Sequence, residues 1–426
     1  MHLFSTVAIV TVMIYSNNVS HQDVYDVEMR LLLMIVAILL PSILKRRMSS
    51  LTSSRNLDST TLKNLSRIHF VSWFACCLLI LGPLKWIEIV RYELGLDGCF
   101  LIDELLILIP FVLSWDIADL LRQIIRPKAS DVFWQNAKMQ SLALIPVSAI
   151  LLTQDIGSAW EPFRQIEKPI YVVIIAGTPF VLPWMLAAIW RFQPIPVGPL
   201  RDAVVETVGQ AETRFSQMLV WNSQNRLTNA AVCGLIPRLR YLLISDGLIE
   251  KLSTQELRAI VAHEAAHVKN RHLIYSCLSI LLPCLSVVIL NQMLNLGSST
   301  DALNHLLILV AMFCWLLMHR FVCRCFEHHA DIEACRILSS IDNKTFDTDS
   351  VHEYSTALQK LNFSDDDDSD WWHPSTDFRV HLLENCSSNP SVLQALELRI
   401  STIQRSILGS VAFLSLVASG LVLIHL

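Results

Sequence analysis

Two histidines four positions apart are the residues of this chain best suited to chemistry. His263 and His267 end the run His263-Glu264-Ala265-Ala266-His267, and on a helix this spacing places both imidazole rings on one face, about one turn apart. Such a pair suits a single Zn²⁺ ion. Glu264 is then the expected general base for a water molecule at the metal. Because the chain has 14 histidines, the alternative is that this motif arose by chance. The surrounding sequence distinguishes the two interpretations.

The helix that carries this motif has a recognisable start. Ser253 and Glu256 form a Ser-x-x-Glu capping box directly before an apolar run, which predicts helix entry near Ser253. Neither Gly nor Pro follows before Pro283. The sequence therefore contains no local signal that ends the helix after His267, and it predicts a helix free to run into the next segment.

The next segment is an apolar hairpin that would bring a third ligand to the site. Residues 273–296 and 302–317 are each long enough to cross a bilayer, and a polar break at 297–301 separates them. At 1.5 Å per residue, His267 and Glu327 lie roughly 48 and 42 Å from the tip, so they return to a similar depth. Two His, one Glu and an open position are the ligand set of a catalytic zinc site. Cys323 and Cys325 are alternative soft ligands.

Taken together, these motifs resemble the integral-membrane gluzincin metalloproteases, the family of the CAAX prenyl endopeptidases and the HtpX heat-shock protease. Five patterns occur in the family's order: 229–234 (Asn-Ala-Ala-Val-Cys-Gly), 242–248 (Leu-Leu-Ile-Ser-Asp-Gly-Leu), the zinc motif, Glu327 to Asp331, and 373–379 (His-Pro-Ser-Thr-Asp-Phe-Arg). The resemblance covers about 150 residues. It implies a zinc-dependent membrane peptidase with one Zn²⁺ per chain.

The resemblance also implies roles for individual residues. His263, His267 and Glu327 are the implied zinc ligands, Glu264 the base, and Asp331 the acceptor that orients a ligand histidine, because a metal-bound imidazole needs its other N–H held. The resemblance places His373 in the site as a catalytic residue and Arg379 as a substrate-binding residue, and either one is expected to help stabilise the oxyanion. It also implies an edge strand that pairs with the substrate backbone, formed by Asn229, Ala230, Ala231 and Val232.

Composition indicates a polytopic membrane protein. The chain has 426 residues, 53% of them hydrophobic and only 17% charged, with a mean hydropathy of +0.46. The net charge of −5 argues against a nucleic-acid partner. Besides the hairpin, apolar runs predict spans at residues 3–15, 29–44, 69–86, 99–121, 139–153, 169–190 and 407–426. Acidic pairs near opposite ends of one run are expected to reach the two interfaces, with a functional site inside the membrane as the alternative: Asp103 with Glu104, and Asp116 with Asp119.

Charge and cysteine usage indicate the compartment of the site. Lys and Arg occur at 45–47, 55–67 and 122–138, on one side of the predicted spans, and also flank the zinc motif, whereas 17–27 and 297–301 have none. By the positive-inside rule the catalytic face is cytoplasmic in a multi-pass protein of the lipid bilayer. The eleven cysteines show no paired framework and are expected to be reduced. A secretory signal at 1–20 is disfavoured, since no basic segment precedes it.

The predicted fold is mainly α: a polytopic helix bundle with a cytoplasmic zincin-like domain that contains a small β-sheet, two of its strands lying on either side of Pro237. The expected domains are 1–193, a membrane region of unassigned role; 194–271 and 321–405, the two segments of the catalytic domain; 272–320, the transmembrane hairpin; and 406–426, a C-terminal span. The acidic run 365–370 is read as a solvated loop, with a calcium or regulatory site as the alternative.

Two classes of function remain open from the sequence. The first is a zinc metalloendopeptidase that hydrolyses membrane-associated or lipid-modified protein substrates. The second is a non-proteolytic membrane scaffold or sensor that retains a metal site, because the first 193 residues match no pattern. Within the first class, the residues do not distinguish prenyl-peptide processing from membrane-protein quality control.

Overall fold

The computed structural model describes residues 26–53, 132–190, 192–223, 225, 227–294, 301–339, 347–362 and 373–424, with short stretches between 68 and 110. The chain contains two compact units, Met1–Trp190 and Arg191–Leu426. The predicted span at 3–15 and the acidic run 365–370 lie outside the described residues, as do Asp116 and most of 99–121.

The first unit is helical in its described parts. Its elements are α2 (Val27–Ser53), α4 (Trp86–Glu88), a π-helical turn (Ile89–Glu93), α6 (Val132–Ala159), α7 (Glu161–Arg164) and α8 (Glu167–Trp190). Trp73, Ile80 and Ile87 are fully buried in its apolar core. Asp103 is only 2% exposed and pairs with Arg91 at 3.0 Å, since a buried carboxylate needs a cationic partner. Its expected position at an interface stays a prediction.

The second unit combines a small mixed sheet with long helices. The strands are β1 (Gln193–Pro194), β2 (Gln217–Trp221), β3 (Ala230–Cys233) and β4 (Tyr241–Ser245), in the order β1-β2-β4-β3. β2 and β4 are parallel, and the other two pairs are antiparallel. The short 3-10 turn Pro237–Leu239 joins β3 to β4, so two strands do lie on either side of Pro237. β3 forms one edge of this sheet.

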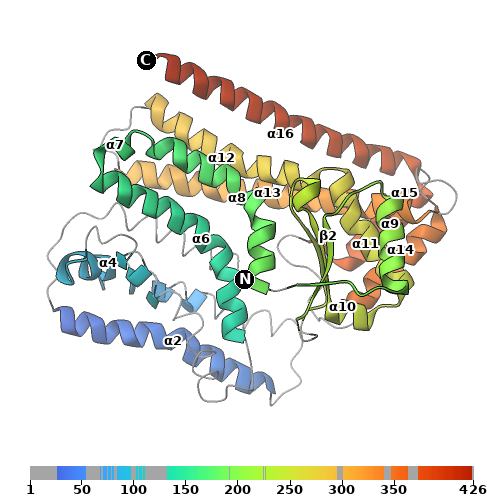
Figure 1. Cartoon of the computed structure of the whole chain (residues 1–426), viewed down its shortest axis with the longest axis horizontal. Coiled ribbons are helices and arrows are strands. Elements are labelled where there is room, and N and C mark those ends of the chain that lie inside the picture. The colour runs from blue at the N-terminus through green and yellow to red at the C-terminus, as the bar shows by residue number, and fades with distance from the viewer. Residues whose placement is uncertain are drawn as a thin grey trace. The chain divides into compact units, whose positions relative to one another are not determined.

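The helices of this unit surround the zinc motif. They are α9 (Pro199–Gln210), α10 (Asp246–Lys251), α11 (Thr254–Lys269), α12 (His272–Leu294), α13 (Asp301–Leu338), α14 (Thr348–Asn362), α15 (Thr376–Ser388) and α16 (Pro390–Ile424). Figure 1 shows the sheet beside a group of helices that includes α9, α11 and α14. α11 packs against β3, α9, α13 and α14. It is therefore the central element of the core, and its Ala262, Ala265 and Ala266 are fully buried.

The predicted start of α11 is confirmed, but its predicted continuation is wrong. Ser253 caps the helix, and its side chain and that of Glu256 make the reciprocal bonds of a capping box. The helix ends at Lys269, and Arg271 adopts a left-handed φ of 57° before α12 begins. The helix ends here without Gly or Pro, and Asn270 caps it, because its side-chain amide donates to the Ala266 carbonyl at 3.1 Å.

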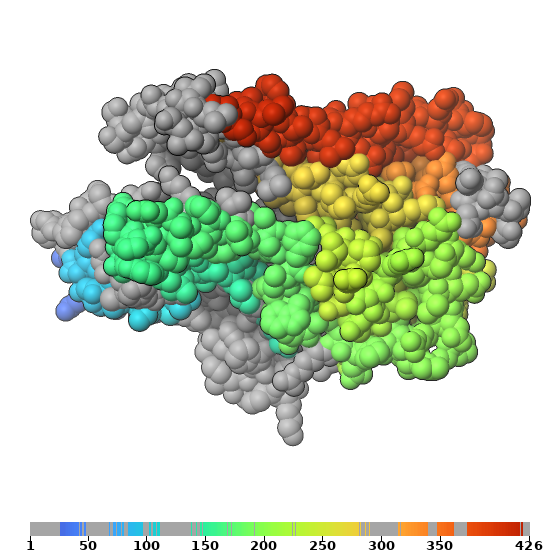
Figure 2. Space-filling view, turned by 45° about the horizontal axis from the view of Figure 1, so that its top comes forward, coloured from blue at the N-terminus to red at the C-terminus, as the bar shows by residue number. Residues whose placement is uncertain are grey.

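The hairpin and the last helix are long. α13 runs unbroken for 38 residues, from the second hairpin arm to beyond Glu327, as the absence of helix breakers predicts. α16 begins at Pro390, well before the predicted span at 407–426, and packs along α12. Figure 2 shows α16 in red lying over the yellow α12. Among the described residues, two segments are long and apolar enough to cross a bilayer, Pro169–Trp190 and Pro390–Val417. The polytopic arrangement remains a prediction.

Candidate metal centre

Three potential ligands converge between α11 and α13. The Nε2 atoms of His263 and His267 lie 3.2 Å apart, and each lies 3.5 Å from a carboxylate oxygen of Glu327. One ligand atom from each residue lies within 4.8 Å of the other two. His263 and Glu327 are 7% exposed. The structure thus brings together the two histidines of the motif and the glutamate that the hairpin geometry predicts.

The hydrogen bonds around the two imidazoles make this cluster suitable for a cation. Nδ1 of His263 lies 3.0 Å from the Asp331 carboxylate, and Nδ1 of His267 lies 3.0 Å from His272. With the ring protons on the Nδ1 atoms, both Nε2 lone pairs and the Glu327 carboxylate face one another. Two lone pairs and a carboxylate that face one another at this distance repel, and a divalent cation between them removes the conflict. Nitrogen and oxygen donors of this kind fit Zn²⁺.

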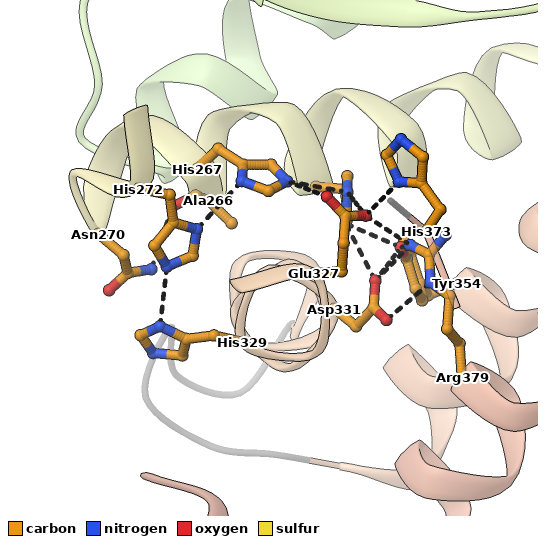
Figure 3. Close-up of polar contacts among 11 residues, drawn as sticks. Ala266, His267, Asn270, His272, Glu327, His329, Asp331, Tyr354, His373 and Arg379 are labelled. Carbon is orange, nitrogen blue, oxygen red and sulfur yellow. Dashed lines mark hydrogen bonds and ion pairs between the residues drawn. The ribbon is translucent and has the colours of Figure 1, made fainter. Parts of the chain in front are cut away.

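Asp331 lies at the centre of a buried network behind His263. Its carboxylate accepts two bonds from the Arg379 guanidinium, at 2.9 Å from Nε and 2.6 Å from Nη2, and one from the Tyr354 hydroxyl at 2.6 Å. The Tyr354 oxygen also lies 3.0 Å from Nδ1 of His263. Burial alone would raise the pKa of Asp331, but Arg379 outweighs it and lowers that pKa. Asp331 is therefore an ionised acceptor for His263 (Figure 3).

The two histidines experience different electrostatic environments. Burial lowers the pKa of His267 to about 4, so its ring is neutral and has a free lone pair. Burial acts in the same direction on His263, but Asp331 and Glu327 outweigh it and raise the pKa to about 9. The pKa of Glu327 is lowered well below its ordinary value, because contacts with His263 and His373 outweigh burial. The negative charges of Asp331 and Glu327 attract both a proton and a metal ion to His263, so the two compete for this side chain.

Glu264 has the environment of a general base. It lies on α11 between the ligand histidines, and burial is the main reason that its pKa rises to about 7. The neighbouring Glu327 raises that pKa further, while His263 and Arg379 oppose the shift. A carboxyl group poised near neutral pH can both accept and return a proton.

His373 and Arg379 occupy different positions relative to the ligands. The His373 side chain is 54% exposed, and its Nδ1 lies 3.0 Å from Oε2 of Glu327, so it stands at the open side of the cluster. Arg379 is 9% exposed, and its donors are directed to Asp331 and Tyr354. This geometry indicates that Arg379 positions Asp331. It does not favour the expected contact of Arg379 with the substrate or the oxyanion.

The expected substrate strand coincides with an edge of the sheet. Ala230, Ala231 and Val232 belong to β3, and Asn229 directly precedes it. Gly234, at the end of β3, lines a small pocket together with His267 and Arg271. The strand edge thus leads toward a metal ligand, as backbone pairing with an extended peptide requires.

The cysteines near Glu327 are not part of the cluster. Cys323 lies 3.5 Å from Nε2 of His319, and Cys325 is buried. Among the described residues, the only grouping of His, Cys, Asp and Glu with metal-ligand spacing is His263, His267 and Glu327. The alternative of sulfur ligands is therefore not supported.

Tyr354 is the member of the site that the sequence reasoning missed. The apolar face of α14 contains Val351, Tyr354, Leu358 and Leu361 at helical spacing, and Tyr354 is fully buried. A buried tyrosine hydroxyl needs a polar partner, so this pattern was the available signal.

A buried His₂Glu cluster with a glutamate next to one ligand histidine defines a metallopeptidase-type centre. In a comparison with known proteins, residues 199–387 match Peptidase family M48. This segment contains every residue of the cluster and its network. The resemblance to the membrane metallopeptidases of this family is confirmed for that part of the chain.

Individual relatives match shorter segments. A Protease HtpX homolog of Persephonella marina is 30% identical over 98 residues, which are 22% of this chain and 33% of that protein. A CAAX prenyl protease 1 homolog of Oryza sativa subsp. japonica is 26% identical over 144 residues, or 31% and 34% of the two chains. The matches span about a third of these relatives. The crystal structure of S. mikatae Ste24p covers 85% of this chain and 99% of its own, with 15% identity and a TM-score of 0.46.

Proposed function

We propose that this protein is a zinc-dependent membrane endopeptidase that cleaves membrane-associated or lipid-modified protein substrates on the cytoplasmic side. The observation that carries the proposal is the convergence of His263, His267 and Glu327, with Glu264 beside them. The match to Peptidase family M48 supports the reaction class. The two segments long enough to span a bilayer support membrane association.

Each residue of the site has a defined part in this proposal. Bound Zn²⁺ supplies Lewis acidity, which polarises a substrate carbonyl and makes a water molecule more acidic. Glu264 takes a proton from the attacking water and returns it to the departing amine nitrogen. His373, at the open side, donates a hydrogen bond to the oxyanion that develops on the carbonyl oxygen.

Substrate position and cell topology are inferred from the surrounding residues. An extended peptide that adds to β3 is held through its backbone, which accounts for broad sequence tolerance. Lys269, Arg271 and Arg320 flank the site in sequence, and by the positive-inside rule they favour the cytoplasmic side. The matched relatives include both a CAAX prenyl protease 1 homolog and a Protease HtpX homolog, so prenylated peptides and other membrane proteins are both substrate classes to test.

The test is the Glu264→Gln variant of the full-length protein in detergent. We expect it to bind one zinc ion as the parent does and to cleave a fluorogenic peptide about 10²–10⁴-fold more slowly, because the amide cannot accept the proton. Equal cleavage by both proteins would refute the role of Glu264. Parent protein that is fully loaded with zinc and cleaves neither casein nor prenylated peptides would refute the peptidase assignment.

A further inference from the structure

Three histidines from three helices form a hydrogen-bonded series that begins at a metal ligand. Nδ1 of His267 lies 3.0 Å from Nδ1 of His272, and Nε2 of His272 lies 3.0 Å from Nδ1 of His329. Figure 3 shows the three rings following one another beside α13, on the side of the cluster away from Arg379. His272 is 2% exposed, and it belongs to none of the motifs that define the ligand set.

We propose that His272 is the positioning residue that fixes the tautomer and ring orientation of the zinc ligand His267. This inference rests on the proposed function, because it assumes that the cluster holds zinc. It gives a role to two histidines, His272 and His329, that the mechanism above does not use.

With zinc bound at Nε2 of His267, the contacts assign a proton position to each ring of the series. Nε2 of His267 faces His263 and Glu327, so its lone pair is the metal-binding one and the ring proton is on Nδ1. His267 therefore donates to Nδ1 of His272. His272 then carries its own proton on Nε2 and donates it to His329. Each neutral ring in this arrangement accepts at one nitrogen and donates at the other.

The fold holds His272 in this orientation by two further features. Its ring stacks on Phe326, with centroids 4.5 Å apart and planes 4° from parallel, and Phe326 directly precedes the ligand Glu327. The left-handed Arg271 ends α11 and makes His272 the first residue of α12. A non-glycine residue in that conformation is strained, and such strain is typical of functional sites. The end of α11 before Arg271, which the sequence does not predict, thus places His272 next to His267.

The two zinc ligands consequently have different outer partners. The charged Asp331 holds His263, whereas a neutral imidazole holds His267. A carboxylate partner increases the basicity of a ligand more than a neutral acceptor does. His267 is therefore a weaker zinc ligand than His263, and the orientation of its ring depends on His272.

The test compares zinc affinities of full-length variants by competition with a chelator, without substrate. His272→Phe keeps an aromatic ring on Phe326 and removes both hydrogen bonds, so zinc should bind about 10–100-fold more weakly. His272→Asn keeps an acceptor near the Nδ1 position and should recover most of this loss. His329→Phe removes only the outer bond and should weaken zinc by about 2–10-fold.

The matched control is His319→Phe, which makes the same change at another buried histidine of the hairpin. His319 stacks on Trp315 and bonds Ser279, and it is not among the grouped ligands. We expect parental zinc affinity in this variant. Parental affinity in His272→Phe, or an equal loss in His319→Phe, would overturn the proposal. If the His272→Phe variant does not fold, the His329→Phe variant provides the test. An unchanged zinc affinity in His329→Phe would then refute the role of the hydrogen-bonded histidines.

The same measurements separate this inference from the proposed function. Parent protein that binds zinc but cleaves no peptide would refute the peptidase and leave the role of His272 intact. Parent protein that cleaves peptides, with a His272→Phe variant of equal zinc affinity, would refute only the role of His272.

Discussion

Oδ1 of Asp331 lies 3.0 Å from Nδ1 of His263, although the apolar hairpin separates the two residues in the sequence. This contact joins α13 to α11 through the metal ligand itself. The Arg379 guanidinium and the Tyr354 hydroxyl bond the same carboxylate from α15 and α14. One buried acidic group thus connects four helices to the metal centre.

Replacing Asp331 should therefore affect both the metal and the fold. Asp331→Asn leaves the Arg379 charge buried without its counter-ion, which should lower the free energy of unfolding by about 3–5 kcal/mol. Zinc affinity should fall by about 10–100-fold, because His263 loses its charged acceptor. Denaturant unfolding and chelator competition measure the two effects.

The double variant Asp331→Asn/Arg379→Met is the control for this prediction. It removes both charges, so it should be more stable than Asp331→Asn while its zinc affinity stays low. A double variant whose loss of stability equals the sum of the two single losses would show that the pair does not act as a unit.

The free edge of β3 predicts different effects of proline at neighbouring positions. The backbone N–H of Ser245 donates to the backbone oxygen of Asn229 at 3.0 Å, so the backbone groups of Asn229 face β4. In an antiparallel pair every second residue faces the same way, so the backbone groups of Ala231 also face β4 and those of Val232 face the free edge. Val232→Pro should leave the protein folded and lower kcat/KM by about 2–10-fold, the loss of one hydrogen bond to the substrate backbone.

Ala231→Pro is the matched variant on the same strand. It removes a bond of the ladder to β4 and should lower the melting temperature, which Val232→Pro should not. Peptidase assays and thermal unfolding of the two variants distinguish the positions. Parental kcat/KM in Val232→Pro would contradict substrate pairing at this edge.

Low pH should destabilise the loop that leads into β3, because the hydrogen bonds of this loop depend on an ionised carboxylate. The Asp246 carboxylate accepts bonds from the backbone N–H groups of Ser223, Asn225 and Gly247, each at 3.0 Å. Burial opposes ionisation, but these bonds and the Ser223 hydroxyl together outweigh it and lower the pKa of Asp246 below its ordinary 3.8. The folded state binds this proton less readily than the unfolded chain. The stabilisation is therefore complete above about pH 4 to 5 and is lost as the pH falls through the folded pKa.

The Asp246→Asn variant tests this dependence. At neutral pH it should be less stable than the parent by about 1–3 kcal/mol, and the difference should shrink as the pH falls below 4. Urea unfolding of both proteins between pH 3 and 7 measures it. A stability difference that is constant across this range would contradict the role of the ionised carboxylate.

The parts of the site that the sequence predicted depend on local spacing and continuity. The His263 and His267 pair, the capping box at Ser253 and the unbroken path to Glu327 each follow from the order of residues along one helix or hairpin. Small residues such as Ala265 also indicate where helices approach closely. These features do not depend on how distant segments fold together.

The remaining parts depend on tertiary contacts. Tyr354 reaches His263 only because α14 packs on α11, and His272 meets His267 only because the chain breaks at Arg271. The local signals, a tyrosine on the apolar face of α14 and Asn270 at the end of α11, do not say which residue each side chain will meet. Arg379 resembles a substrate-binding cation in the sequence, yet the fold directs its guanidinium inward to Asp331.

Elemental analysis of the intact protein tests most directly whether His263, His267 and Glu327 jointly hold one zinc ion. Full-length protein, purified without chelators, should contain one zinc per chain, and Glu327→Gln protein handled identically should contain much less. Folded parent protein that contains no zinc, or a Glu327→Gln variant that retains the full amount, would contradict the account.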